Sequence, residues 1–551
     1  MQPSDLNPPL PYSAWTPGQW ELITRLASSD KRILLLEAPT GTGKSAIAVG
    51  LARLLGGRSI FLTGTKQLQD QYAETFTPDM LTARGRSNFP CLQEPGVDAS
   101  QAICTVGGSK NPACPYYVQR DIALKAPEAV LNYSYWFYQA NYARRFIQPN
   151  LLVCDEAHTL EDEVRKFATV TLRRRAASEL YDCPPWPVNA DTYTLDDWAA
   201  WAADAQAALK WEYLDLKKSG STADMQHIKN IRSIYDACHT LLSPGMPEDG
   251  WVPKLIPTGV EFRPVWVQPL MPKLVTQHWP GPDGKILLMS ATILSAELFA
   301  HQLGLPLREI DFIRAPSVFP RENRPLYYAP VGKVGRSQPD SHDRVVRAVD
   351  DILDAHPGAR GIVHTVSYKL GQHLLRNSRH KRRLLSHDSR DRAAKLNLFR
   401  SRAGEGMVLV SPSMNTGVDL PYDLLRFQVI AKLAFPDLGD GQIKKRMKLG
   451  PDGEPDPTGQ LWYNWATACS LIQAYGRGVR AEDDSCVSYL LDGNWGWFRH
   501  AVRDMLPVWF TEAIISRPAQ ADPTAEEIIA QIRGTHTPAT PPPVLHPMLT
   551  A

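Results

Sequence analysis

The feature that most constrains this chain is a glycine-rich loop between an apolar run and a helical run. The run ILLLEAP ends at Pro39, the loop TGTGKS follows, and the helical stretch AIAVGLARLL begins at Ala46. A short apolar run that leads into a helix is typical of a buried parallel strand and its crossover helix. Gly41 and Gly43 allow the backbone to curl so that its N–H groups face phosphate oxygens, and the helix N-terminus favours the anion. The sequence therefore predicts an α/β fold with a phosphate-binding loop.

The same loop carries side chains suited to a nucleotide and its metal ion. Lys44 can reach the β- and γ-phosphates, and the Ser45 hydroxyl can join a Mg²⁺ shell. The residues predicted here to bind nucleotide are Thr40, Gly41, Thr42, Gly43, Lys44 and Ser45.

An acidic pair follows another apolar run, NLLVC, in the order Asp155-Glu156-Ala157-His158. At the end of a strand, Asp155 could hold Mg²⁺ through its water shell, and Glu156 could orient or deprotonate an attacking water. Taken alone, these four residues could form an exposed acidic turn. Together with the phosphate loop they favour a nucleotide-hydrolysing site.

Length and composition indicate a globular protein of two or more domains. The chain has 551 residues, of which 43% are hydrophobic and 21% charged, and this length exceeds that of one ordinary core. The net charge of +2 argues neither for nor against a nucleic-acid partner. Such a partner would have to meet local basic clusters. The candidates, each of which could also be a solvated face, are Arg173-Arg174-Arg175, Lys381-Arg382-Arg383 and Lys444-Lys445-Arg446.

No targeting or spanning segment is expected. The start MQPSDLNPPLP lacks a basic region and an apolar core, and no apolar run approaches the roughly 18–20 residues of a membrane span. The eight cysteines are unevenly spaced, unlike a small secreted disulfide framework. A reducing, cytoplasmic location fits these features best.

Further apolar runs predict two α/β blocks. SIFLTGT and KILLMSAT complete the first block, and GIVHTV, GMVLVSPS, FQVIAKLAF and CVSYLLD form the second. The long interval before KILLMSAT must contain inserted structure, and its pattern is helical. Its tryptophans, Trp198, Trp201 and Trp211, are interpreted as core in preference to a base-stacking platform. The Pro- and Thr-rich end is interpreted as a disordered tail.

In order and over nearly the whole chain before the tail, these elements resemble the XPD/DinG family of superfamily-two DNA helicases. The segments that carry the resemblance are YSAWTPGQ, SIFLTGTKQLQDQY, CPYYVQRDIALKAPEAVLNYSYWF, LLMSATIL, VLVSPSMNTGVDLPYD, KLAFP and QAYGRGVRAEDDSCVSYLLD. Ala38 stands where the stricter phosphate-loop pattern has Gly, a departure that is common in helicases. The resemblance implies two RecA-like parallel-sheet lobes that use ATP and Mg²⁺. It also implies action on single-stranded DNA and duplex junctions with 5′-to-3′ movement.

The resemblance also assigns roles to individual residues. Gln19 would recognise adenine, Asp419 would bind the nucleotide, and Ser290-Ala291-Thr292 would couple the ATP and DNA sites. Gln473, Arg477 and Arg480 would face the ATP, where guanidinium groups stabilise charge that develops on the γ-phosphate. Short polar side chains and backbone groups suit phosphate contacts that position a strand without reading its sequence. The candidate strand contacts are Thr63, Lys66, Gln67, Thr365, Asn415 and Thr416.

The cysteines in the first half leave a metal question open. Family members often hold a 4Fe–4S cluster through four cysteines, but the matching stretch here offers Cys91, Cys104 and Cys114 alone. Three interpretations remain: a cluster held by three thiolates and a ligand such as Asp98, a vestigial metal-free insertion, and a zinc site. Cys154, beside the acidic pair, is interpreted as strand packing.

The predicted organisation divides lobe 1 around two insertions. Lobe 1 comprises residues 1–83, 119–160 and 273–320, with a cysteine-bearing insertion at 84–118 and a helical, arch-like insertion at 161–272. Lobe 2 spans 321–515, and the tail spans 516–551. The leading functional hypothesis is an ATP-dependent DNA helicase or translocase. The alternatives are a DEAH-type RNA helicase and a nucleotide-gated DNA-binding scaffold without productive unwinding.

Overall fold

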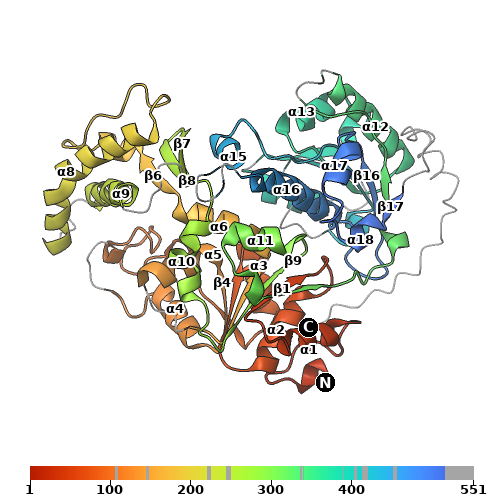
Figure 1. Ribbon diagram of the computed structural model, residues 1–551, viewed down its shortest axis with the longest axis horizontal. Coiled ribbons are helices and arrows are strands. Elements are labelled where there is room, and N and C mark those ends of the chain that lie inside the picture. The colour runs from red at the N-terminus through yellow and green to blue at the C-terminus, as the bar shows by residue number, and fades with distance from the viewer. Residues whose placement is uncertain are drawn as a thin grey trace. The chain divides into compact units, whose positions relative to one another are not determined.

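The protein forms two compact units, shown with their helices and strands in Figure 1. The computed structural model describes residues 1–105, 110–143, 148–219, 225–243, 250–335, 338, 340–388, 390–401, 406–412, 420–448, 450, 454 and 456–515. Unit 1 consists of Met1–Pro316 and Phe435–Ala466, and unit 2 consists of Ser317–Ala434 and Thr467–Ala551. Among the described residues, no helix combines the length and apolar character needed to cross a membrane. The predicted tail lies outside the described residues.

Unit 1 is built on a parallel sheet of seven strands in the order β10-β1-β9-β5-β2-β4-β3. Every residue of β1, β2 and β5 is buried, as expected for strands covered on both faces. The strands are β1 (Ile33–Glu37), β2 (Ser59–Thr63), β3 (Met80–Thr82), β4 (Glu128–Asn132), β5 (Leu151–Asp155), β9 (Lys285–Ser290) and β10 (Ile310–Arg314). The helices of this layer are α1 (Gln19–Ala27), α2 (Lys44–Leu55), α3 (Lys66–Thr75), α4 (Pro115–Lys125), α5 (Tyr133–Tyr138), α6 (Leu160–Ala168) and α11 (Ala296–Leu303).

The order of the central strands determines where the functional loops lie. β9 pairs in parallel with both β1 and β5, so Glu37 is opposite Ser290 and Asp155 is opposite Met289. The carboxyl ends of these three strands therefore share one edge of the sheet. Ligands of open α/β sheets bind at this kind of edge.

The long insertion of unit 1 contains a small sheet as well as the expected helices. It comprises β6 (Val170–Arg173), α7 (Arg174–Ser178), α8 (Leu195–Ser219), α9 (Met225–Leu241), β7 (Trp251–Ile256) and β8 (Gly259–Pro264), followed by α10 (Met271–Leu274). The antiparallel sheet, in the order β6-β8-β7, was not anticipated from the helical pattern. Trp198 and Trp201 are buried in the insertion's own core, as predicted. The prediction is wrong for Trp211, which is 74% exposed.

Unit 2 repeats the architecture with a second parallel sheet of seven strands, in the order β13-β14-β12-β15-β16-β11-β17. The four runs predicted for this block form its central strands, which confirms two parallel-sheet lobes. The strands are β11 (Leu326–Tyr328), β12 (Gly361–His364), β13 (Leu384–Ser386), β14 (Val408–Ser411), β15 (Phe427–Ile430), β16 (Val487–Leu490) and β17 (Ile514–Ile515). The helices are α12 (Ser341–Ala355), α13 (Tyr368–Asn377), α14 (Arg392–Ser401), α17 (Trp495–Ala501) and α18 (Val508–Thr511).

One segment from the second half of the sequence packs with unit 1. Residues Phe435–Ala466, which contain α15 (Gly441–Arg446) and the first half of α16 (Thr458–Tyr475), belong to that unit. The predicted second lobe, 321–515, did not foresee this assignment. The remaining predicted boundaries stay predictions.

Candidate functional site

Three predicted motifs of unit 1 meet at the carboxyl edge of its sheet. The phosphate loop follows β1, the acidic pair ends β5, and Ser290-Ala291-Thr292 ends β9. The backbone N–H of Ala38 donates to the Ser290 carbonyl at 2.9 Å, which fixes the loop beside β9. Glu37 is fully buried, pairs with Arg314 at 2.7 Å and accepts the Leu294 N–H. These contacts hold the segments after β1 and β9 together.

The phosphate loop depends on glycine at two positions with a left-handed backbone. Gly41 has φ of 85° and Gly43 has φ of 74°, where other residues are strained. A Cβ on Gly43 would also lie 2.2 Å from Gln19 Nε2. That amide donates to the Thr42 carbonyl at 2.9 Å, so Gln19 supports the loop from α1. The structure thus brings Gln19 to the predicted site, while its recognition of adenine stays a prediction.

Lys44 is the first residue of α2 and folds back across the loop. Its Nζ lies 3.2 Å from the Ala38 carbonyl oxygen and 3.4 Å from that of Pro39. The Thr42 hydroxyl donates to the same Pro39 carbonyl at 2.8 Å. The loop therefore presents a lysine ammonium group at its mouth, held by carbonyl groups that a phosphate could replace.

The two predicted Mg²⁺ ligands are linked by a tyrosine that sequence reasoning missed. The buried Tyr72 of α3 donates its hydroxyl to Asp155 Oδ2 at 2.9 Å and also hydrogen-bonds Ser45. Burial, and then the neighbouring Glu156, raises the pKa of Asp155 to about 6, and Lys44 opposes the rise. Oxygen donors converging beside a lysine fit a hydrated Mg²⁺ and its phosphates. Tyr72 gave no signal in the sequence beyond its place at the end of the family-like segment SIFLTGTKQLQDQY.

The acidic pair is connected to the end of β9 through a histidine. Glu156 has a left-handed backbone with φ of 51°, and its N–H donates to Asp155 Oδ1 at 2.8 Å. His158 Nδ1 lies 2.8 Å from Ser290 Oγ and 3.3 Å from Glu156 Oε2. Ser290 Oγ in turn accepts the Thr292 N–H at 3.1 Å. One hydrogen-bonded chain thus joins the two motifs.

The predicted strand contacts of unit 1 divide into exposed and buried side chains. Lys66 and Gln67 are exposed in the first turn of α3, and Lys66 donates to Asn88 at 2.6 Å. Thr63 is fully buried and its hydroxyl donates to the Thr65 carbonyl at 3.2 Å, so its predicted strand contact stays a prediction that would use the backbone. Thr63 therefore shapes the turn before α3 from inside.

Thr365 of unit 2 repeats this arrangement. It is fully buried, and its hydroxyl donates to the Ser367 carbonyl at 3.2 Å, just before α13. Its predicted strand contact likewise stays a prediction that would use the backbone. The other predicted contacts of this unit, Asn415 and Thr416, lie outside the described residues, as does Asp419.

The arginine-bearing motif of unit 2 is held by a buried aspartate. Asp484 accepts the Arg480 N–H at 3.1 Å and the Ser485 N–H at 2.8 Å. A Cβ on Gly478 would lie 2.9 Å from Cys486 Cβ, so this turn needs glycine to pack against its neighbour. Gln473 is buried in α16, and Arg477 lies in the turn that follows. The roles predicted for Gln473, Arg477 and Arg480 remain predictions.

In the described part of the cysteine-bearing insertion, the candidate ligands for iron–sulfur or zinc are not gathered into one set. Among those residues, no three His, Cys, Asp or Glu side chains are grouped to hold a metal ion. Cys104 lies beside the Tyr117 hydroxyl, and Asp98 Oδ1 accepts both the N–H and the hydroxyl of Ser100. Cys104 and Asp98 thus each have a local partner. Cys154 is buried in β5, which confirms its interpretation as packing.

Contacts between arginine side chains and tyrosine rings stabilise this insertion. The Arg86 guanidinium lies 5.0 Å from the ring centre of Tyr116 and donates to the Tyr117 hydroxyl at 3.1 Å. Arg120 lies 4.8 Å from the ring centre of Tyr117. Cation–π contacts of this kind stabilise by about 0.5–2 kcal/mol each.

Comparison with known proteins identifies two helicase domains. A model of the DEAD/DEAH box helicases matches residues 16–180, and a model of the helicase C-terminal domain matches residues 350–513. The ATP-dependent DNA helicase YoaA of Haemophilus influenzae is 36% identical over 77 residues, 12% of this chain and 12% of that protein. A probable ATP-dependent helicase of Methanocaldococcus jannaschii is 26% identical over 201 residues, 30% of this chain and 29% of that protein. The matches therefore span less than a third of either relative.

Solved structures share the fold. An XPD helicase structure superimposes with a TM-score of 0.60 and 16% identity, covering 88% of this chain and 98% of its own. Xpd4 of S. tokodaii gives a TM-score of 0.55 and 15% identity, covering 91% of this chain and 99% of its own. At these identities the likeness establishes the architecture.

Proposed function

Because the chain is an XPD/DinG-like member of the superfamily-two helicases, we propose that it is an ATP-driven motor that moves along single-stranded DNA and separates duplexes. The observation that carries the proposal is the arrangement around Tyr72, which links Ser45 to Asp155 beside Lys44. Oxygen ligands, a lysine and a glycine-rich loop are together the parts that nucleotide hydrolysis requires.

Nucleotide binding would use groups that already face the loop. Lys44 would exchange its contacts with the Ala38 and Pro39 carbonyls for phosphate oxygens. Gln19 would keep the loop in place through its bond to Thr42. Mg²⁺ held by Ser45 and Asp155 would supply neutralisation of phosphate charge.

Hydrolysis would depend on the position of Glu156. Its carboxylate lies 3.3 Å from His158 at the carboxyl edge of the sheet, where it could orient or deprotonate a water. His158 would transmit a change in the position of Glu156 to Ser290 and, through Ser290, to Thr292. The predicted actions of Gln473, Arg477 and Arg480 on the γ-phosphate belong to the same proposal, as does a cytoplasmic location.

Strand binding would use the exposed polar side chains after β2. Lys66 and Gln67 offer an ammonium and an amide suited to phosphate, and Thr63 fixes the turn that places them. Contacts of this type do not read sequence, so binding should be sequence-independent and should weaken with salt. We propose 5′-to-3′ movement because the resemblance to the XPD/DinG family implies that direction.

Two variants test the assignment of the site. Lys44→Ala should abolish ATP hydrolysis, because the loop then loses its phosphate-facing cation. Glu156→Gln should retain ATP binding and lose hydrolysis, because the amide cannot accept a proton from water. A filter-binding assay with labelled ATP, run beside phosphate release, separates the two outcomes. Normal turnover by both variants would show that the site is misplaced.

A second experiment tests substrate and direction. Duplexes with a 5′ or a 3′ single-stranded DNA overhang, and matched RNA versions, are mixed with protein and ATP, and strand displacement is followed by fluorescence. The proposal predicts displacement from the 5′-overhang DNA. Displacement of RNA duplexes alone would support the DEAH-type RNA helicase, and DNA binding with no displacement would support the scaffold.

A further inference from the structure

Arg446 is among the largest fully buried side chains of the protein, although it ends a run of three basic residues. As the last residue of α15, its guanidinium lies between two indole rings, 4.0 Å from the ring centre of Trp266 and 4.0 Å from that of Trp462. Burial lowers its pKa to about 10, and Glu161 opposes that change, so Arg446 remains charged at neutral pH. The surface interpretation of this basic cluster is therefore wrong for Arg446.

The charge of Arg446 is paired with the helix that follows the acidic motif. Its Nη1 and Nη2 donate to Oε1 and Oε2 of the buried Glu161, the latter at 3.1 Å. Glu161 is the second residue of α6, which begins as the short turn Ala157–Thr159 ends. The Thr159 N–H donates to the Glu156 carbonyl at 2.8 Å. Arg446 is thus separated from Glu156 by a single helical turn.

The segment Phe435–Ala466, which contains Arg446, also contacts the chain directly after Ser290-Ala291-Thr292. Trp465 of α16 donates its indole N–H to the Ile293 carbonyl at 2.8 Å, and this side chain is buried. Ile293 immediately follows Thr292. The segment Phe435–Ala466 therefore makes one buried polar contact beside each of the two motifs that His158 joins.

Close packing fixes Arg446 and Trp465 relative to each other. A Cβ on Gly459, in the first turn of α16, would lie 2.1 Å from the Arg446 carbonyl oxygen. The start of α16 consequently lies directly against the end of α15. The Gln442 amide adds a bond to the Val265 carbonyl at 3.2 Å, beside Trp266.

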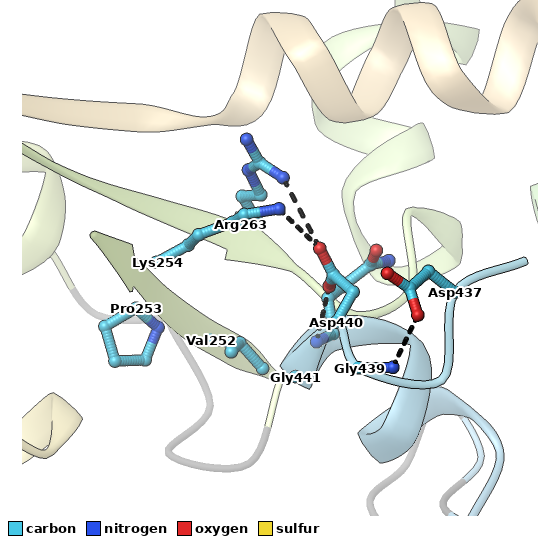
Figure 2. Close-up of a pocket in the computed structure, with 9 residues that line it drawn as sticks. Val252, Pro253, Lys254, Arg263, Asp437, Gly439, Asp440 and Gly441 are labelled. Carbon is cyan, nitrogen blue, oxygen red and sulfur yellow. Dashed lines mark hydrogen bonds and ion pairs between the residues drawn. The ribbon is translucent and has the colours of Figure 1, made fainter. Parts of the chain in front are cut away.

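The outer edge of the segment has a separate ion pair, visible in Figure 2. Asp440 lies 2.5 Å from Lys254 and 3.9 Å from Arg263 at a cavity of about 260 Å³ between α15 and the β7–β8 hairpin. This pair contacts the small sheet of the insertion and touches neither motif. It supplies a matched control for the buried contacts.

We propose that Arg446 is a positioning residue for the acidic and Ser-Ala-Thr motifs, and that the segment Phe435–Ala466 holds both motifs in the arrangement that hydrolysis needs. This inference rests on the proposed motor function. α16 carries both Trp462, which stacks on Arg446, and Trp465, so the two buried contacts are joined through one helix. Nucleotide binding itself uses Lys44 and Gln19, whose hydrogen bonds among the described residues are to other parts of unit 1.

The test replaces the ion pair by apolar side chains in the full-length protein. Removing one partner alone strands a buried charge, whereas replacing both is commonly tolerated in folding. Arg165, which also contacts Glu161, keeps its ion pair with Asp162. The variant Arg446→Met with Glu161→Met should lower the kcat for ATP hydrolysis measured with single-stranded DNA by about 10-fold or more, since a misplacement of about 1 Å can cost about 100-fold in rate. The KM for ATP should stay within about two-fold, because the loop contacts are intact. Trp465→Phe, which removes one hydrogen bond, should lower the kcat by about five-fold.

Asp440→Asn is the matched control, because asparagine keeps the cap of α15 while the edge ion pair is lost. Its kcat should equal that of the natural protein. Hydrogen exchange provides a readout that needs no hydrolysis: amides of residues 156–160 and 293–295 should exchange faster in the double variant, and those of 41–46 should not. A folded double variant with an unchanged kcat and unchanged exchange overturns the inference. Absence of hydrolysis in the natural protein would instead overturn the proposed function, and the exchange measurement would still decide the role of Arg446.

Discussion

Replacing Asp155 by Asn should stabilise the protein in the absence of Mg²⁺ and nucleotide, and more so at high pH. Asp155 is buried, and burial is the main reason that its pKa rises from 3.8 to about 6. Asparagine can keep both native contacts, because its oxygen can accept the Glu156 N–H while its amide donates to the Tyr72 hydroxyl. The Tyr72 hydroxyl can then donate to Ser45. The substitution therefore removes a charge with little loss of hydrogen bonding.

The sign and size of the effect follow from the pKa. Between pH of about 4 and 6 the folded protein keeps a proton that the unfolded chain has released, so stability falls as pH rises through this window. The pKa difference of roughly two units corresponds to about 3 kcal/mol above pH 6, at about 1.36 kcal/mol per unit. At pH 4.5 the same arithmetic leaves about 1 kcal/mol. The gain from Asp155→Asn should therefore be about three times larger at pH 8 than at pH 4.5.

Urea unfolding in EDTA, followed by tryptophan fluorescence at both pH values, measures this difference. The exposed Asp30, changed to Asn, is a control that should leave the free energy of unfolding unaltered at either pH. A destabilised Asp155→Asn variant, or a gain that does not depend on pH, would refute the argument that burial of this carboxylate costs stability. The same variant should lose ATP hydrolysis, which would show that the site sacrifices stability for its chemistry.

Two further substitutions probe the loop and the tyrosine. Gly43→Ala should weaken binding of a fluorescent ATP analogue by about 10-fold or more, because a left-handed backbone disfavours alanine and the new methyl group displaces Gln19; unchanged affinity would contradict the loop geometry. Tyr72→Phe should raise the Mg²⁺ concentration for half-maximal hydrolysis by about 10-fold, because outer contacts orient metal ligands such as Asp155. An unaltered Mg²⁺ titration of that variant would remove Tyr72 from the site.

Strands and motif positions were predictable because they depend on short apolar runs and local glycine requirements. ILLLEAP and NLLVCDEAH became β1 and β5 because runs of this kind are stable when both faces of a parallel sheet are covered. The glycines at 41 and 43 were predictable for the same local reason, since their left-handed backbone excludes most other residues. The convergence of the motifs then followed from the rule that parallel strands end at one edge.

Contacts between distant segments were not predictable from local patterns. Tyr72 reaches Asp155 across 83 positions of sequence, and nothing in α3 distinguishes it from a core tyrosine. Thr63 and Thr365 were expected at the surface because short polar residues suit phosphate contacts, but each hydroxyl satisfies a carbonyl of its own turn. A polar side chain at the end of a buried strand can therefore bind either a nucleic-acid phosphate or a carbonyl of its own turn, and the sequence does not distinguish the two.

The assignment of Phe435–Ala466 to unit 1 is a stronger case of the same limit. Its basic run suggested a solvated face, yet the Arg446 side chain lies between Trp266 and Trp462, which are almost 200 positions apart in the sequence. It is also paired with Glu161. The small sheet of the insertion escaped notice for a related reason, since β6 is followed by three helices before β7 and β8. Periodicity detects neither pairing.

The proposed motor is tested most simply by ATP hydrolysis of the purified protein with no nucleic acid, with single-stranded DNA and with single-stranded RNA, using Lys44→Ala as the blank. A DNA-driven motor should hydrolyse ATP much faster with single-stranded DNA, and the variant should show no hydrolysis. Stimulation by RNA alone would change the substrate. Hydrolysis that neither DNA nor RNA stimulates would contradict the proposed motor.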